Sequence, residues 1–498
     1  MKKVGSSFLL ALLLGCSSSS SSPPLVEYPT EDAAVSQDAD ASEDASTDQD
    51  DASAPDAPVA DADAEASIPQ GVVQLSDGSC FIKGVTSDGH LVFERNADLM
   101  VWPESGTAAV MAGSNWDISY DMELVRGRFL GMWRGPDVLT QTLWVWSKAG
   151  GLETIAVPTI GNRLYARPES DEYAYWLKTS NPLQADVYAT KAGQGKGVRV
   201  VAKLDTGVVT SECVSRTAYS NDDLLVAGCP DGGTTPRVAG YKLDGTGQSR
   251  LILDGSAPGM WLNHARSQVL VQTASASSLR SLVDSSAPLA LDIPVSQAAF
   301  SADDATVLYL DNAGKLKRAD AKNPAAPAAL ASALSILGMS SDAHYAMFAT
   351  KGVPADKQTD LVLIDTTVAS PTPVSLAAEK ASLVGFSNDG AYAVYRATPQ
   401  YPVNGADELF VVATAGGAPQ KISDRADRPL FDGAVVYWFE FDVSVKKAFV
   451  KAVRLSALSN VIEVANGLDI PTAHAVVSGK HLYVASKLGL WDYPALSP

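Results

Sequence analysis

Beyond residue 71 the hydrophobic positions of the chain fall in short runs that are separated by polar turns. The clearest example extends over residues 386–395, where Ser387, Asp389 and Gly390 lie between two apolar runs. Short runs bounded by Gly, Asp, Asn and Pro are typical of β-strands joined by tight turns. No stretch keeps the 3.6-residue period of a long helix. The pattern therefore predicts an all-β domain over residues 71–498.

The turn and the strand that follows it recur along the chain, with a period of about 43 residues. Copies occupy residues 87–93, 220–226, 301–310, 340–348 and 387–395, and weaker copies occupy 169–176 and 431–438. An acidic residue precedes the expected third strand in four units, at Asp98, Asp186, Asp360 and Glu408. A repeat of this length with four strands predicts a β-propeller. We count about ten repeat units and expect eight to ten four-stranded blades, although propellers usually have four to eight.

The two ends of the repeat region complement each other. Residues 474–493 supply only three strands of the last unit, whereas residues 71–75 form an isolated apolar run before the first unit. A strand from one end that completes the blade at the other end closes the ring and protects its open edges. We therefore predict that residues 71–75 join the last blade, with Val73 close to Leu490.

The repeat resembles that of the TolB-like β-propellers, in which an aromatic residue and Ser precede a Pro-Asp-Gly turn. Residues 386–390 and Glu408 match this motif best, with Asn388 in place of the proline. The resemblance extends over residues 71–498 and implies a propeller of the bacterial envelope. It implies no particular activity, because propellers host many functions.

The start of the chain has the features of an export signal. Two lysines precede an apolar run at residues 8–14, which is too short to span a bilayer, and Gly15 and Cys16 follow it. This order resembles a bacterial lipobox and predicts a signal peptide at residues 1–15. Cys16 would then carry diacylglycerol and palmitate chains that bind membrane lipid. An ordinary secretory signal with an incidental Cys is the alternative.

We expect an exported bacterial lipoprotein of the outer membrane, on its periplasmic face or at the cell surface, because Ser17 rather than Asp follows the Cys. Residues 16–70 are rich in Ala, Asp and Ser, and no basic residue lies between Lys3 and Lys83. Such a segment cannot bury enough apolar surface to offset the entropy of ordering, so it predicts a disordered tether. The net charge of −19 argues against nucleic acid as a partner, because phosphate binding needs clustered Lys and Arg.

Three cysteines remain in the propeller region. Cys213 and Cys229 flank the turn at residues 220–223 almost symmetrically, so a hairpin centred there would place them within reach of a bridge. An exported protein occupies a disulfide-permissive compartment, and we predict a Cys213–Cys229 disulfide. The alternative is that both are small core residues. Cys80 is then unpaired, and we interpret it as a buried free thiol rather than a nucleophile.

The sequence contains no Gly-x-Ser-x-Gly, no His-Glu-x-x-His, no paired Cys-x-x-Cys and no phosphate-binding loop. Four histidines fall at the first turns of different units, and we interpret them as solvated turn residues: His90, His264, His344 and His481. Seven arginines lie near first strands, which line the channel of a propeller: Arg163, Arg167, Arg216, Arg266, Arg396, Arg425 and Arg428. They either bind an anion or an acidic peptide, or form ion pairs with nearby acids, which is the interpretation that we favour.

These observations predict a binding scaffold rather than an enzyme. We expect no catalytic residue, metal or cofactor, and we expect an envelope protein, peptide or polymer as the partner. The alternative is a propeller enzyme, similar to a lactonase, lyase or glycosidase, with its site in the central channel. Three or more carboxylate, Asn or His side chains that converge on the axis would favour the enzyme, whereas a channel lined by Ala, Ser and Gly would favour binding.

Overall fold

The computed structural model divides the chain into two units, residues 1–68 and 69–498. Residues 72–497 are described, except for gaps at 97, 104–109, 114–121, 127, 135–140, 160–163, 168–169, 182, 206–215, 292, 352–358, 369, 378–380, 399–406, 443, 445–446 and 470–473. The predicted signal peptide, the predicted tether and Cys16 thus lie outside the described residues. No helix in the described ranges is long and apolar enough to cross a membrane.

The second unit is built from antiparallel sheets, of which eight have four strands and one has seven. In the seven-stranded sheet, β33 (Gln420–Phe431) passes from one blade into the next. Its residues 420–426 pair with β32, and its residues 427–431 pair with β34. This sheet therefore makes two blades, and the described strands form ten blades, the upper end of the predicted eight to ten.

The blades follow the chain order, and each begins with the strand that we call its first strand. Blades 1 to 5 comprise β2 (Cys80–Val85), β3 (Leu91–Arg95), β4 (Asp98–Trp102) and β5 (Val110–Gly113); β6 (Met122–Arg126), β7 (Phe129–Arg134), β8 (Gln141–Ser147) and β9 (Gly151–Thr159); β10 (Leu164–Ala166), β11 (Glu172–Lys178), β12 (Gln184–Lys191) and β13 (Val198–Asp205); β14 (Arg216–Tyr219), β15 (Asp223–Gly228), β16 (Arg237–Lys242) and β17 (Gln248–Asp254); and β18 (Gly259–Leu262), β19 (Gln268–Gln272), β20 (Ser277–Ser281) and β21 (Leu289–Leu291).

Blades 6 to 10 comprise β22 (Val295–Phe300), β23 (Thr306–Asp311), β24 (Lys315–Asp320) and β25 (Asn323–Ser332); β26 (Ser335–Met339), β27 (Tyr345–Lys351), β28 (Thr359–Asp365) and β29 (Val374–Ala377); β30 (Ala381–Phe386), β31 (Tyr392–Ala397), β32 (Asp407–Ala413) and the first half of β33; the second half of β33, β34 (Val435–Asp442), β35 (Lys447–Arg454) and β36 (Ile462–Asp469); and β37 (His474–Ser478), β38 (His481–Ser486), β39 (Gly489–Pro494) and β1 (Val73–Asp77). A short 3₁₀ turn, Leu455–Ala457, follows β35.

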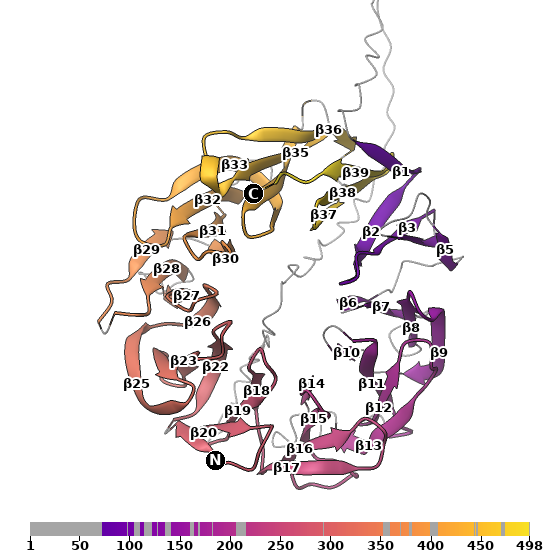
Figure 1. The fold of residues 1–498 in the computed structure, drawn as a ribbon, viewed down its shortest axis with the longest axis vertical. Helices are drawn as coiled ribbons and strands as arrows, with labels where there is room; N and C mark the ends of the chain where they lie inside the picture. The colour runs from indigo at the N-terminus through magenta and orange to yellow at the C-terminus, as the bar shows by residue number, and fades with distance from the viewer. Residues whose placement is uncertain are drawn as a thin grey trace, which may run out of the picture. The chain divides into compact units, whose positions relative to one another are not determined.

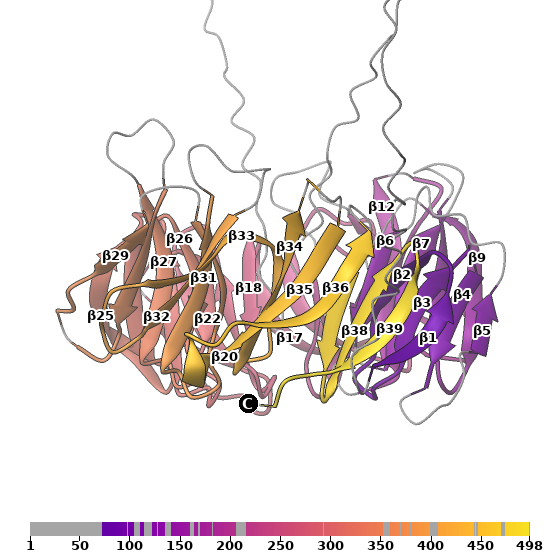
Figure 2. The ribbon, with the colours of Figure 1, turned by 90° about the horizontal axis from the view of Figure 1, so that it is seen from above.

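Within this unit the blades succeed one another around a ring, as Figure 1 shows. The first strands lie nearest the centre, and the fourth strands, such as β9 and β25, lie at the periphery. Neighbouring first strands contact one another, for example β22 with β26 and β26 with β30. In the side view of Figure 2 the strands cross the thickness of the ring from one face to the other. The fold is thus a β-propeller, as the repeat predicted.

Strand β1 closes the ring in the predicted way. It pairs antiparallel with β39, with Val73 opposite Asp492 and Ser76 opposite Leu490. Blade 10 is thereby completed by the strand that comes first in the chain. The hydrophobic core continues across this junction, because Phe93 of blade 1 and Leu490 of blade 10 belong to one buried cluster. The prediction is confirmed for residues 73–75, although Ser76 rather than Val73 lies opposite Leu490. Val72 precedes the strand, and Gly71 lies outside the described residues.

The repeated Ser and Asp residues build the turn between the first and second strands, which we call the first turn. In blade 8 the Ser387 hydroxyl donates to the Asp389 carboxylate at 2.6 Å and accepts the Tyr392 amide at 2.8 Å. Ser301 and Ser340 make equivalent bonds in blades 6 and 7. These bonds satisfy buried turn groups that the strands cannot reach. The recurring polar residues are therefore turn chemistry, which explains their period.

The first turns of neighbouring blades are also joined to each other. Asn221 Nδ2 of blade 4 donates to the Ala265 carbonyl of blade 5 at 2.9 Å. The Asn388 amide of blade 8 donates to the Gly433 carbonyl of blade 9 at 3.0 Å. Asp304 of blade 6 accepts two backbone amides of the blade 5 turn. Similar bonds link successive turns from blade 3 to blade 9, so this edge of the ring is a continuous hydrogen-bonded belt.

The structure describes two of the three propeller cysteines. Cys80 is free and buried, as predicted, and burial raises the pKa of its thiol. Cys229 is buried and disulfide-bonded. Its predicted partner, Cys213, lies outside the described residues, so the Cys213–Cys229 pairing stays a prediction.

Candidate functional site

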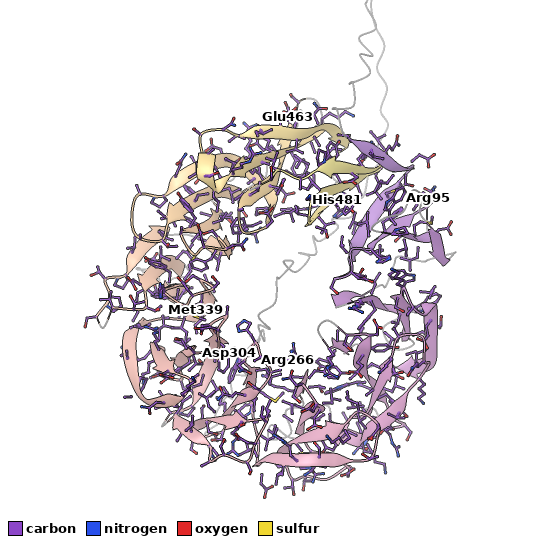
Figure 3. All side chains as sticks on the ribbon, in the orientation of Figure 1. Arg95, Arg266, Asp304, Met339, Glu463 and His481 are labelled. Carbon is purple, nitrogen blue, oxygen red and sulfur yellow. The ribbon has the colours of Figure 1, made fainter. Side chains whose placement is uncertain are left out.

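The surface nearest the centre of the ring is formed by the first strands, and it is half-exposed. In β26, β30 and β37 nearly every residue is partly accessible, whereas the second strands behind them are almost fully buried. Leu337 in β26 is 36% exposed. We call β22, β26, β30 and β37 together the inner wall. Figure 3 places Met339, the last residue of β26, at the inner edge of the ring.

The inner wall carries mostly small and aliphatic side chains. Its partly accessible members include Ser296, Ala298, Ile336, Leu337, Met339, Leu383, Val384, Ala475 and Val476. Most of these side chains pack on one side against the buried clusters behind the wall, and the aliphatic surface that stays partly exposed can bind a partner. The wall has the Ala and Ser content that we expected of a binding channel, and it also has Leu, Ile and Met, which the sequence analysis did not anticipate.

Two glycines let neighbouring first strands of the inner wall approach each other. A Cβ atom on Gly338 would lie 2.4 Å from Leu383 Cδ2, and one on Gly385 would lie 2.7 Å from the Phe431 ring. Both distances are far below van der Waals contact. The absence of a side chain at these positions thus allows Leu383 and Phe431 to fill the junctions between blades.

A group of charged residues lies between β30 and β37, where blade 8 passes into blade 9. Arg396 pairs with Asp407 at 3.4 Å, and Arg428 pairs with Asp427 at 3.4 Å. Burial raises the pKa of Asp427, against the opposing effect of Arg428. Asp407 is close enough to raise the pKa of Asp427 further. This Asp427 carboxyl group has a perturbed pKa on the inner side of the ring.

His474 lies at the junction between blades 10 and 1. Its ring contacts Phe81 edge-on, with the ring centroids 4.1 Å apart. Lys83 Nζ lies over the same Phe81 ring, 4.9 Å from its centroid, and forms an almost fully buried ion pair with Glu94 at 3.1 Å. Burial, with Arg428 and Lys83 nearby, lowers the pKa of His474 to about 4. The imidazole is therefore neutral in the fold at neutral pH.

Acidification should destabilise the ring through His474. In the unfolded chain its pKa returns to about 6.5, so the unfolded state binds more protons between pH 6.5 and pH 4 and the free energy of unfolding falls as the pH falls through this window. The variant His474→Phe, which keeps a ring against Phe81, should lose this part of the dependence. Urea unfolding of both proteins at pH 7, 5.5 and 4.5 measures the difference. Parallel pH dependences would contradict the assignment.

The four turn histidines each lie beside an aspartate. The Nδ1 atoms of His264, His344 and His481 are 3.2, 3.0 and 2.8 Å from a carboxylate oxygen, and these side chains are 40–56% exposed. The prediction of solvated turn residues is correct for these three. It is wrong for His90, which is buried and packs near Trp146 of blade 2. In the described ranges no group of three or more His, Cys, Asp or Glu could hold a metal ion.

The predicted ion pairs of the first-strand arginines occur at Arg167, Arg396 and Arg428. Arg163 lies outside the described residues. Arg266 differs from the paired arginines: it is half-buried, and no carboxylate among the described residues lies within ion-pair distance of it.

Comparison with known proteins gives a likeness in fold. No protein-family model and no curated protein matches the sequence. Among solved structures, a eukaryotic initiation factor is 15% identical, with a TM-score of 0.47 over 69% of this chain and 86% of that one. The putative TolB from Agrobacterium tumefaciens is 13% identical, with a TM-score of 0.26 over 50% of this chain and 94% of TolB. The β-propeller domain of Cps50 (Swd1) from Myceliophteria thermophila is 12% identical, with a TM-score of 0.30 over 58% and 98% of the two chains. The structural neighbours thus include TolB and another β-propeller.

Proposed function

We propose that the protein is a lipid-anchored scaffold of the bacterial envelope, which binds a protein, a peptide or an envelope polymer through its inner wall and catalyses no reaction. The observation that carries this proposal is the half-exposed aliphatic surface of β26 and β30. The predicted acylation of Cys16 would hold the protein at the outer membrane. The predicted tether would let the ring reach a partner away from the lipid surface.

The composition of the inner wall favours an extended, mainly apolar segment of a partner. A segment of this kind buries the exposed parts of Leu337, Leu383 and Val476 without desolvating a charge, and burial of apolar surface contributes about 25 cal/mol per Å². Affinity would come from many modest contacts around the ring. Specificity would come from the charged group between β30 and β37.

One observation favours the alternative of a channel enzyme. The Asp427 carboxyl group is largely buried and its pKa is raised, a property that it shares with general acids. Ion-pair networks perturb pKa values as well, and Arg396 and Arg428 place Asp427 in such a network. Turnover of a lactone or glycoside by the wild type that is lost in Asp427→Asn would establish the enzyme and reject the scaffold.

The binding surface is tested by one substitution on the inner wall and a matched one outside it. Leu337 is 36% exposed on β26, and Leu251 is 52% exposed on the peripheral strand β17. We expect Leu337→Asp to reduce capture of the partner from envelope extracts at least tenfold, because the wall then carries a charge that binding must desolvate. Leu251→Asp should capture as the wild type does. Equal capture by all three proteins, each with an unchanged thermal midpoint, would reject the inner wall as the site.

The anchor is tested separately. The variant Cys16→Ser cannot be acylated and should move from the membrane fraction to the soluble fraction, with loss of incorporated radiolabelled palmitate. Retention of the variant in the membrane fraction would contradict lipid anchoring and leave the inner-wall proposal untouched.

A further inference from the structure

Two arginines from different blades reach the same turn. Arg167, which follows the first strand of blade 3, donates through Nη2 to the Asn221 carbonyl of blade 4. Arg266, in the first turn of blade 5, donates through Nη1 to the Tyr219 carbonyl of blade 4 at 2.7 Å. The two acceptors are two residues apart. The two guanidinium groups therefore reach the first turn of blade 4 from the two neighbouring blades.

Two cations share one carboxylate beside this turn, and Asp223 of the turn itself is paired with Lys242 at 3.2 Å. Glu172 pairs with Arg167 and also lies 3.5 Å from Lys191. One carboxylate thus faces two cations, and Arg266 is a third cation near the same turn. Where blades 3 to 5 are described, no carboxylate approaches the Arg266 guanidinium within ion-pair distance, and its pKa is lowered by burial and by the charge of Arg167.

The position of Arg266 fits a ligand that approaches from the centre of the ring. Its residue lies at the junction of the two innermost strands of blade 5, and Figure 3 places it at the inner edge. The backbone at Arg266 has a φ of 53°, and the equivalent turn residues Asp304 and Ala343 have φ values of 59° and 56°. This left-handed conformation belongs to the repeated first turn, which fixes where the Arg266 side chain begins.

We infer that Arg266, supported by Arg167, binds a carboxylate group of the partner that enters the ring. A guanidinium presents a planar fork of donors that matches a carboxylate bidentately. A bound carboxylate would also supply the negative charge that the half-buried Arg266 lacks. The inference rests on the proposed function and adds a chemical requirement to it: the bound segment carries an acidic side chain, or its own C-terminus, at the blade 3 to 5 side of the ring.

The test uses the full chain and a dye-labelled tetraglutamate peptide at low salt, with tetraglutamine as the neutral probe. Fluorescence anisotropy should show binding of tetraglutamate and none of tetraglutamine. Arg266→Gln should weaken tetraglutamate binding at least tenfold, and Arg266→Lys, which keeps the charge but not the fork, should weaken it about threefold. Arg250→Gln, on the peripheral strand β17, is the matched control and should bind as the wild type does.

Several results would overturn the inference. The first is that Arg266→Gln and the wild type bind tetraglutamate with affinities within twofold of each other. The second is that the wild type binds the two peptides equally, and the third is that it does not bind tetraglutamate at 1 mM peptide. Displacement of tetraglutamate by inorganic phosphate but not by acetate would assign the site to phosphate and overturn the carboxylate. If Arg266→Gln has a lowered thermal midpoint, the tetraglutamate affinity of Arg266→Lys alone tests the inference. An unaffected Arg266→Gln together with lost capture by Leu337→Asp would reject this inference while the proposed function stands.

Discussion

A chain that begins at Gly78, and therefore lacks strand β1, should unfold at a much lower urea concentration than the intact protein. Strand β1 supplies the fourth strand of blade 10 and covers the edge of β39. Its loss exposes Leu490, which is fully buried in the ring, and removes Leu75 from the cluster that joins blades 10 and 1. Full burial of a Leu side chain contributes about 1.5–3 kcal/mol, so we expect a loss of at least about 3 kcal/mol.

The matched control for this truncation is a chain that begins at Pro69. It removes only the residues before the second unit and keeps β1. We expect its unfolding midpoint to equal that of the full chain. The chain that begins at Gly78 should also unfold less cooperatively, because its ring is open at one blade. Equal midpoints for the two truncated proteins would contradict closure of the ring by β1.

The second large effect is expected at Asp304, which fixes blade 6 to blade 5. Its carboxylate accepts the amides of His264 and Ala265, both at 2.7 Å, and the Asn263 side-chain amide at 3.0 Å. Asp304→Ala leaves these donors without their acceptor, and each hydrogen bond to a charged group contributes about 1.5–3 kcal/mol. We expect a loss of about 3 kcal/mol in the free energy of unfolding. Asp304→Asn, which can still accept hydrogen bonds, should lose less.

Asp303 is the matched control because it lies in the same turn and bonds only within it. Its carboxylate accepts the Ser301 hydroxyl at 2.6 Å and the Ala305 amide at 3.0 Å. Asp303→Ala should therefore lose much less stability than Asp304→Ala, because its bonds are local and exposed to solvent. Urea unfolding of both variants measures the two losses. A loss for Asp303→Ala as large as that for Asp304→Ala would show that the belt between blades adds no stability of its own.

The fold could be predicted because its signal is local and repeated. Ser387, Asp389 and Gly390 form their turn through bonds to neighbours close in sequence. The same residue types therefore predict the turn wherever the repeat recurs. The incomplete last unit and the isolated run at residues 71–75 likewise predicted ring closure, because an unpaired strand can cover the unpaired edge of a sheet. The blade number was harder to fix, because β33 serves two blades without a break.

The candidate site could be predicted only in part, because its contacts join different blades. The ion pairs of Arg167 and Arg396 form within single blades, which is why the sequence could predict them. The bonds of Arg167 and Arg266 to the blade 4 turn depend instead on how neighbouring blades are placed, which no single repeat encodes. Arg167 and Arg266 are far apart in sequence and meet through the turn at Tyr219. The exposure of Leu337 likewise follows from its place on an innermost strand, since its apolar character alone predicts burial.

The most direct test of the account is a cryo-electron microscopy map of the full chain with its captured partner. The account predicts one ring of ten blades, with β1 in blade 10 and with partner density against β26 and β30 of the inner wall. An acidic group of the partner should lie beside Arg266. Partner density on the peripheral strands, with none against the inner wall, would contradict the account.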